Sequence, residues 1–180
     1  RLAERERRIA AEVIDSMTEA VCVTDLDFRF TSINRAFTRM TGYDESAAIG
    51  QSAALLNCDR HPPDHYQAMR DQFVRSGHWR GELWQERHDG TEFLCWLEIS
   101  AVLDPGGERT HYVCVMNDIT DRKRAEQELR YLANFDTLTN LPNRTLLSER
   151  LSRAIVRARR QGARIGVLFL DLDRFKDIND

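Results

Sequence analysis

Several classes of protein are excluded by what this sequence lacks. No apolar run approaches the roughly 18 residues that a membrane-spanning helix needs, so we expect no membrane contact in this segment. The 4 cysteines show no Cys-x-x-Cys spacing, which disfavours a zinc site. The 26 basic and 29 acidic residues are mixed along the chain, and no basic stripe indicates a nucleic-acid partner.

The two ends of the chain also lack familiar signals. The sequence starts at Arg1 without a signal peptide and stops at Asp180 inside a motif-like stretch, so we expect a fragment of a longer protein. Most of the cysteines lie in apolar, strand-like runs, where a thiol packs as a small hydrophobic group. A reducing, cytoplasmic compartment is therefore the simplest expectation. A parent protein anchored in the membrane upstream of this segment stays open.

In the first two thirds of the chain, the spacing of hydrophobic residues predicts helices in some segments and strands in others. Residues 1–17 are predicted to form an amphipathic helix. Asn34 stands where a helix N-cap is expected, and Gly42 fits a left-handed C-cap. Further helices are predicted over residues 45–49 and 65–74, and strands over residues 20–24, 28–33, 79–87, 93–102 and 111–116. The order indicates an α+β domain over residues 18–120, with its helices on one face of an antiparallel sheet.

The composition changes after this domain. Residues 121–133 are charged and predict a linker helix, and residues 144–161 predict a second, amphipathic helix. The apolar run Ile165–Leu170 is typical of a strand that is buried on both faces. Asp171 would then lie at the carboxyl end of that strand, where ligands gather in α/β sheets.

Three motifs carry a resemblance to a known family of sensory domains. They are Asn34-Arg-Ala-Phe37 with Thr41-Gly-Tyr43, then Trp79-Arg-Gly-Glu-Leu-Trp84, then Asp118-Ile-Thr-Asp-Arg-Lys123. In this order and spacing they resemble the PAS family in its S-box form. The resemblance implies a PAS fold, in which helices cover one face of a five-stranded antiparallel sheet around a small-molecule pocket.

Two later motifs resemble the GGDEF, or diguanylate cyclase, family. They are Asp136-Thr-Leu-Thr-Asn-Leu-Pro-Asn-Arg144 and Asp171-Leu-Asp-Arg-Phe-Lys-Asp-Ile-Asn-Asp180, and no GG(D/E)EF signature follows within the chain. We therefore expect residues 134–180 to be the truncated N-terminal portion of an α/β GGDEF domain, with its catalytic residues unknown.

The same resemblance implies roles for four residues of this segment. Asp171 and the carbonyl of Leu172 would hold Mg²⁺, which prefers hard oxygen ligands. Lys176 would neutralise the phosphates of GTP, and Asn179 would hydrogen-bond the guanine edge. Taken alone, acidic residues after a strand more often cap the next helix, but the two motifs together favour the metal site.

The contents of the PAS pocket are open at this stage. Trp79, Trp84, Gln85 and Trp96 are candidate pocket residues, and a non-covalent flavin is one alternative. Aromatic residues in a sheet are more often part of the core. An apolar metabolite held by Arg80 or Arg87 is a second alternative, and an empty pocket is the leading one.

Haem and a covalent flavin are disfavoured. His65 lies near the haem-ligand position of some relatives, but the matching residue is Tyr66, so we expect His65 to cap the helix or face solvent. Cys58 resembles a flavin-adduct cysteine, yet the residues after it are His61-Pro62-Pro63, and we interpret it as an ordinary loop cysteine.

The exit from the domain is the predicted route of signal transmission. Asp118, Ile119 and Thr120 join the last strand to the linker helix, and either Asp118 or Thr120 is expected to cap that helix.

These features predict the sensory module of a bacterial diguanylate cyclase. The parent would form a homodimer and join two GTP molecules into cyclic di-GMP, while the fragment itself would be inactive. The alternative is a non-catalytic PAS dimerisation module, in which a degenerate GTP-binding GGDEF domain regulates a downstream domain such as a phosphodiesterase.

Overall fold

The computed structural model describes residues 2–171. The chain divides into two compact units, one up to Arg124 and one from Ala125 onward, and each is described by itself. Within the described residues, no helix combines the length and the apolar character that crossing a membrane requires.

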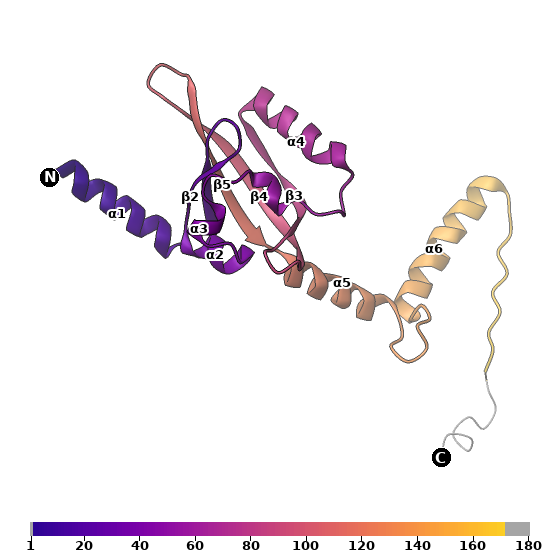
Figure 1. Cartoon of the computed structure of the whole chain (residues 1–180). Coiled ribbons are helices and arrows are strands. Elements are labelled where there is room, and N and C mark those ends of the chain that lie inside the picture. Colours follow the sequence, from indigo (N-terminus) through magenta and orange to yellow (C-terminus); the bar gives the residue numbers. More distant parts are fainter. Residues whose placement is uncertain (1, 172–180) are drawn as a thin grey trace, which may run out of the picture. The chain divides into compact units, whose positions relative to one another are not determined.

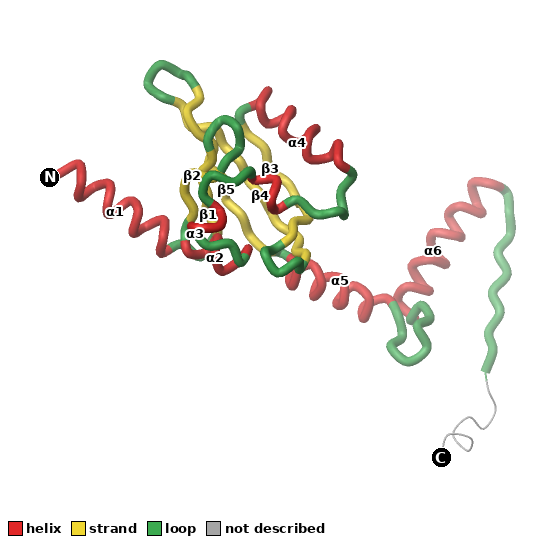
Figure 2. Tube along the Cα trace, viewed as in Figure 1, coloured by secondary structure: helices red, strands yellow, loops and turns green. Residues whose placement is uncertain are grey.

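A five-stranded antiparallel sheet organises the first unit. The elements up to the end of the sheet are α1 (Leu2–Ser16), β1 (Ala20–Thr24), β2 (Phe30–Ile33), α2 (Arg35–Thr41), α3 (Glu45–Ala48), the 3₁₀ helix η1 (Ala53–Leu56), α4 (Pro63–Ser76), β3 (His78–Glu86), β4 (Glu92–Leu103) and β5 (Arg109–Asp118) (Figures 1 and 2). The strand order is β2-β1-β5-β4-β3, which leaves β3 at one edge. The predicted α+β architecture is confirmed.

Alternation along the strands places the core on the helical side of the sheet. In β4, Phe93, Cys95, Leu97 and Ile99 are buried, while the residues between them are partly exposed. Side chains of a strand point alternately to its two faces, so these four share one face. They form one cluster with buried residues of the covering helices, among them Phe37 and the other members Ala36, Ala48, Leu56, Tyr66 and Phe73.

Local signals in the sequence fix the start of the first helices. The Asn34 side chain accepts the backbone N–H of Phe37 and so caps α2, which ends at Gly42 with φ of 79°. Asn34 also accepts the Val21 N–H and donates to the carbonyl of Ile14. Because this buried amide is fully bonded, it ties α1, β1 and α2 together.

Two element boundaries differ from the predicted ones for physical reasons. Strand β2 begins at Phe30 rather than at residue 28, because Phe28 has φ of 60° in the turn that precedes the strand. Helix α4 begins at Pro63, before the predicted residue 65. Proline suits the first turn of a helix because its missing N–H would have no partner there.

All four cysteines are buried and free. Cys22 lies directly opposite Cys114 across the β1–β5 pair. A side-chain hydrogen bond with Cys114, and then burial, raise the pKa of the Cys22 thiol well above its ordinary value. The Cys22 thiol therefore stays protonated and packs as a core side chain.

The second unit contains a helix pair and an extended segment. Helix α5 (Thr120–Asn134) begins in the first unit, and α6 (Arg144–Gln161) is capped by Asn143 and ends at Gly162. The prediction of a buried strand over Ile165–Leu170 is wrong for this structure: the segment forms no strand, and Leu168, Phe169 and Leu170 are more than four-fifths exposed. An apolar run buries itself only if other strands pair with it, and no described strand does so.

Candidate functional site

An apolar cavity lies between the sheet and the helices of the first unit. Its volume is about 50 Å³, and its lining comes from β1, β3, β4, β5, α4 and the segments around β2 and η1. The lining residues are Cys22, Thr24, Phe28, Phe30, Ala53, Leu56, Asn57, Tyr66, Met69, Arg70, Leu83, Gln85, Leu97, Ile99, Cys114 and Met116. This is the position that the PAS resemblance implies for a ligand pocket.

Of the four residues proposed for the pocket from the sequence, only Gln85 lines this cavity. Trp84 and Trp96 alternate with buried residues of β3 and β4, so their side chains lie on the face of the sheet away from the helices. Trp79 shares the face of Gln85 but packs against the edge of the core cluster. The strand assignments were correct, but the sequence did not show which face the tryptophans occupy.

Gln85 is one of the polar residues that line the cavity. It is only 5% exposed, and its amide oxygen has no hydrogen-bond partner among the described residues. Leaving a buried acceptor unpaired costs about 1–3 kcal/mol. A ligand that donates a hydrogen bond would remove this cost.

The size of the cavity limits what it accepts. An apolar cavity of about 150 Å³ binds benzene, and the present one is about a third of that volume at 50 Å³. A flavin or a haem therefore does not fit unless the lining moves apart. Tyr66, at the position compared with a haem ligand, is buried and uses its hydroxyl in bonds to Cys58 and Trp84.

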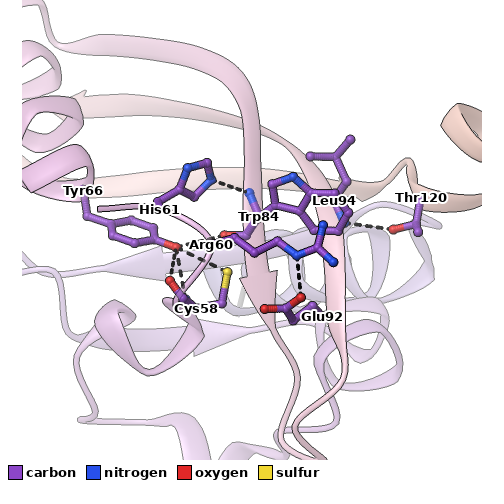
Figure 3. Close-up of polar contacts among 8 residues, drawn as sticks. All are labelled: Cys58, Arg60, His61, Tyr66, Trp84, Glu92, Leu94 and Thr120. Carbon is purple, nitrogen blue, oxygen red and sulfur yellow. Dashed lines mark hydrogen bonds and ion pairs between the residues drawn. The ribbon is translucent and has the colours of Figure 1, made fainter. Parts of the chain in front are cut away.

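Tyr66 belongs to a polar cluster at the edge strand β3 (Figure 3). Its hydroxyl accepts the Cys58 N–H at 3.0 Å and donates toward the Trp84 carbonyl at 3.0 Å. The Trp84 N–H donates to His61 Nε2 at 2.9 Å. His65 stacks on His61 with ring centroids 4.1 Å apart, so the expectation that it caps the helix or faces solvent is wrong.

Thr120 anchors the start of α5 to the sheet. Its hydroxyl accepts the Leu94 N–H of β4 at 2.8 Å (Figure 3). The Ile119 N–H donates to the Leu94 carbonyl at 2.9 Å. Thr120 therefore does not cap the helix with its hydroxyl. The Asp118 carboxylate instead accepts the Thr120 N–H at 2.9 Å, which is one of the free donors at the helix start.

Arg87 completes this exit. Its guanidinium forms an ion pair with Asp118, donates to the Met40 carbonyl of α2, and lies 4.3 Å from the Phe93 ring centroid. Burial raises the pKa of Asp118, but hydrogen bonds from Thr120 and Arg87 outweigh it, so the net pKa is lowered. Sequence reasoning considered Arg87 as an anchor for a metabolite and missed this pair, since the two residues are 31 positions apart.

Little of the proposed metal and nucleotide site is described. Asp171 is exposed, while Leu172, Lys176 and Asn179 lie outside the described residues. In the part of the chain that is described, no group of three His, Cys, Asp or Glu side chains could hold a metal ion. The donor chemistry of Asp171 still fits Mg²⁺, which usually takes only one or two carboxylates from a protein.

Known proteins resemble this chain along both units. It is 31% identical over 172 residues to the cyclic di-GMP phosphodiesterase PdeR of Escherichia coli K12, covering 95% of this chain and 26% of PdeR. It is 54% identical over 61 residues to the bifunctional diguanylate cyclase/cyclic di-GMP phosphodiesterase MucR of Pseudomonas aeruginosa PAO1, covering 34% of this chain and 9% of MucR. The chain thus spans less than a third of either relative.

A solved structure shares the fold of the first unit. The structure of an RNA-binding light-oxygen-voltage receptor aligns with a TM-score of 0.63 and 26% identity, covering 71% of this chain and 36% of that chain. Residues 10–119 match the family described as the PAS fold, and residues 133–180 match the one described as the diguanylate cyclase GGDEF domain. The chain belongs to the PAS family, and its PAS domain is followed by a GGDEF segment.

Proposed function

We propose that this chain is the sensory and regulatory module of a protein that synthesises cyclic di-GMP from two GTP molecules. The PAS domain responds to a ligand or partner, and its last strand passes the response to α5. The similarity to MucR, whose name includes diguanylate cyclase activity, supports this proposal.

The bonding at the exit is the observation that carries the proposal. Ile119 and Thr120 bond both backbone groups of Leu94, and Asp118 is held by Arg87. Helix α5 follows directly and leads into the GGDEF segment that starts at residue 133. A displacement of the sheet therefore has a direct mechanical connection to the helix that enters the catalytic region.

Within the GGDEF segment, we assign Asp171 and the Leu172 carbonyl to metal binding. A bound Mg²⁺ would stabilise negative charge on the phosphates of GTP. Lys176 would bind those phosphates and Asn179 the guanine edge. The parent would act as a homodimer, because two GTP molecules must be joined to each other.

The test is product formation by the full-length parent. With GTP and Mg²⁺, chromatography of the products should detect cyclic di-GMP, and Asp171→Asn should abolish it without unfolding the PAS domain. Deletion of the PAS domain should change the rate rather than the identity of the product. If the purified parent binds GTP but forms no cyclic di-GMP, the proposal is wrong.

The similarity to PdeR favours one second candidate. PdeR is a phosphodiesterase that this chain resembles over 172 residues. In that case the GGDEF domain would bind GTP without catalysis and regulate a downstream phosphodiesterase. GTP would then change the rate of cyclic di-GMP hydrolysis by the parent, and no synthesis would occur.

A further inference from the structure

The outward-facing backbone of Trp84 is bonded entirely by side chains. Strand β3 is an edge strand, and such edges normally leave N–H and C=O groups free. Here His61 Nε2 accepts the Trp84 N–H at 2.9 Å, and the Tyr66 hydroxyl lies 3.0 Å from the Trp84 carbonyl oxygen (Figure 3). His61 comes from the segment that leads into α4, and Tyr66 comes from the beginning of α4 itself.

The same segment also holds the indole of Trp84. The Arg60 guanidinium lies 3.8 Å from the Trp84 ring centroid and pairs with Glu92 at 2.5 Å. We call residues 58–66 the clasp, since they hold α4 against β3 by these contacts. Tyr66 and two further residues of α4, Met69 and Arg70, line the cavity, so the clasp lies over the ligand pocket.

The bond between His61 and Trp84 requires one protonation state of His61. Nε2 accepts a hydrogen bond, so the ring is neutral and carries its proton on Nδ1. Protonation would turn Nε2 into a donor that faces another donor, the Trp84 N–H. The bond would then be lost.

We propose that the clasp is a pH-sensitive contact, in which His61 bonds the edge strand β3 at the Trp84 N–H while it is neutral and releases that N–H when it is protonated. The imidazole of His65 favours the neutral state, because the two rings stack 4.1 Å apart and two positive charges at that distance repel.

The surroundings of His61 also favour the neutral form of its ring. Burial of the ring, and then the neighbouring charge of His65, lower the pKa of His61 from its ordinary value of 6.5. Burial raises the pKa of Tyr66 to about 12, so its hydroxyl remains a donor at all pH values considered. The other charged or titratable groups of the cluster are the Arg60–Glu92 pair and the Cys58 thiol.

The sign of the pH dependence follows from the lowered pKa. The bond is fully present above pH 6.5, the ordinary value, and is lost as the pH falls through the lower pKa of folded His61. Histidine is the side chain whose unperturbed pKa makes such a change accessible near neutral pH.

Release of the clasp has a route to α5. Trp84 lies directly opposite Leu94, whose own backbone groups bond Thr120 and Ile119. The backbone groups of Trp84 and Leu94 thus point away from each other, which makes them a non-hydrogen-bonded pair with closely spaced side chains. A shift of β3 at Trp84 is therefore passed to Leu94, the residue that anchors the start of α5. Only this last step rests on the proposed function; the clasp itself does not.

The test measures the clasp directly in the 180-residue chain. Hydrogen exchange of the Trp84 amide is followed by NMR between about pH 5 and 8 and corrected for intrinsic exchange. The protection factor should fall by up to about tenfold per pH unit between 6.5, the ordinary pKa, and the lower pKa of folded His61, because one proton is taken up on opening in that range. His61→Gln, which keeps an acceptor but does not titrate, should remove this dependence, whereas His111→Gln, at an exposed position of β5, should retain it.

The wild-type protein provides a second readout that needs no variant. The ¹⁵N shift of His61 Nε2 should be that of an unprotonated nitrogen, and His61 should titrate with a midpoint below 6.5. A Trp84 protection factor that stays constant with pH would overturn the proposal. So would an unchanged dependence in His61→Gln, or a protonated Nε2 at neutral pH. None of these measurements depends on cyclic di-GMP chemistry.

Discussion

Thr120 is a buried polar residue at the start of α5 whose hydroxyl has its partner on strand β4. Thr120→Val keeps the shape of the side chain but leaves the Leu94 N–H without an acceptor. We expect the PAS domain to lose about 1–3 kcal/mol of unfolding free energy in urea denaturation. Thr120→Ser keeps the hydroxyl and should lose clearly less. Equal stability of the Val variant and the wild type would show that this bond has no energetic role.

Asp118 makes the exit sensitive to acid. Its lowered pKa means that its contribution to stability is present above the pKa of the unfolded chain, about 3.9, and is lost as the pH falls through the folded pKa. Asp118→Asn should therefore destabilise the domain by about 1–2 kcal/mol at pH 7, through weaker bonds to Arg87 and Thr120. The difference from wild type should shrink in urea titrations near pH 3. A difference that is independent of pH would contradict the ion pair.

At the scale of elements, we expect the extended run Ile165–Leu170 to have little protection from hydrogen exchange. Its apolar side chains are exposed, and no described strand pairs with it. In the 180-residue chain, we expect its amides to exchange with solvent hydrogen at close to the intrinsic rate. The amides of β5, which is paired on both sides, should exchange orders of magnitude more slowly and serve as the internal reference. Protection of the run equal to that of β5 would disprove this expectation.

What the sequence could predict depends on how local the cause is. Asn34 and Gly42 act within a few residues of their own helix, and both caps were predictable from residue type. The apolar pattern of Ile165–Leu170 says that the run prefers burial but not which strands would bury it. Likewise, the faces occupied by Trp84 and Trp96 depend on the exact phase of each strand, which short alternating patterns leave undetermined.

The candidate site depends on contacts that sequence patterns do not encode. Thr120 bonds Leu94 at a separation of 26 residues. The clasp likewise requires that the loop before α4 contacts the edge of β3. No sequence pattern near His61 predicts that contact. Gln85 could be proposed because it offers an amide among the aromatic residues of the predicted strands. Its orientation into the cavity came only from the structure.

At the scale of the whole molecule, the 180-residue chain should form no cyclic di-GMP. It contains no GG(D/E)EF signature, and its described residues hold no three-ligand metal group. Incubation with GTP and Mg²⁺ should therefore yield no product above a reaction without protein. The full-length parent, assayed in parallel, is the positive control. Product formed by the short chain would refute this prediction.

The coupling of the PAS domain to catalysis is tested most directly in the full-length parent, by the rate of cyclic di-GMP formation with Thr120→Val and Thr120→Ser. A loss of about 1–3 kcal/mol at the anchor is enough to change the population of a two-state linker several-fold or more. We predict that Thr120→Val changes the basal rate at least several-fold, that Thr120→Ser stays close to wild type, and that GTP affinity is unchanged in both. Identical rates for all three proteins would contradict signalling through this anchor.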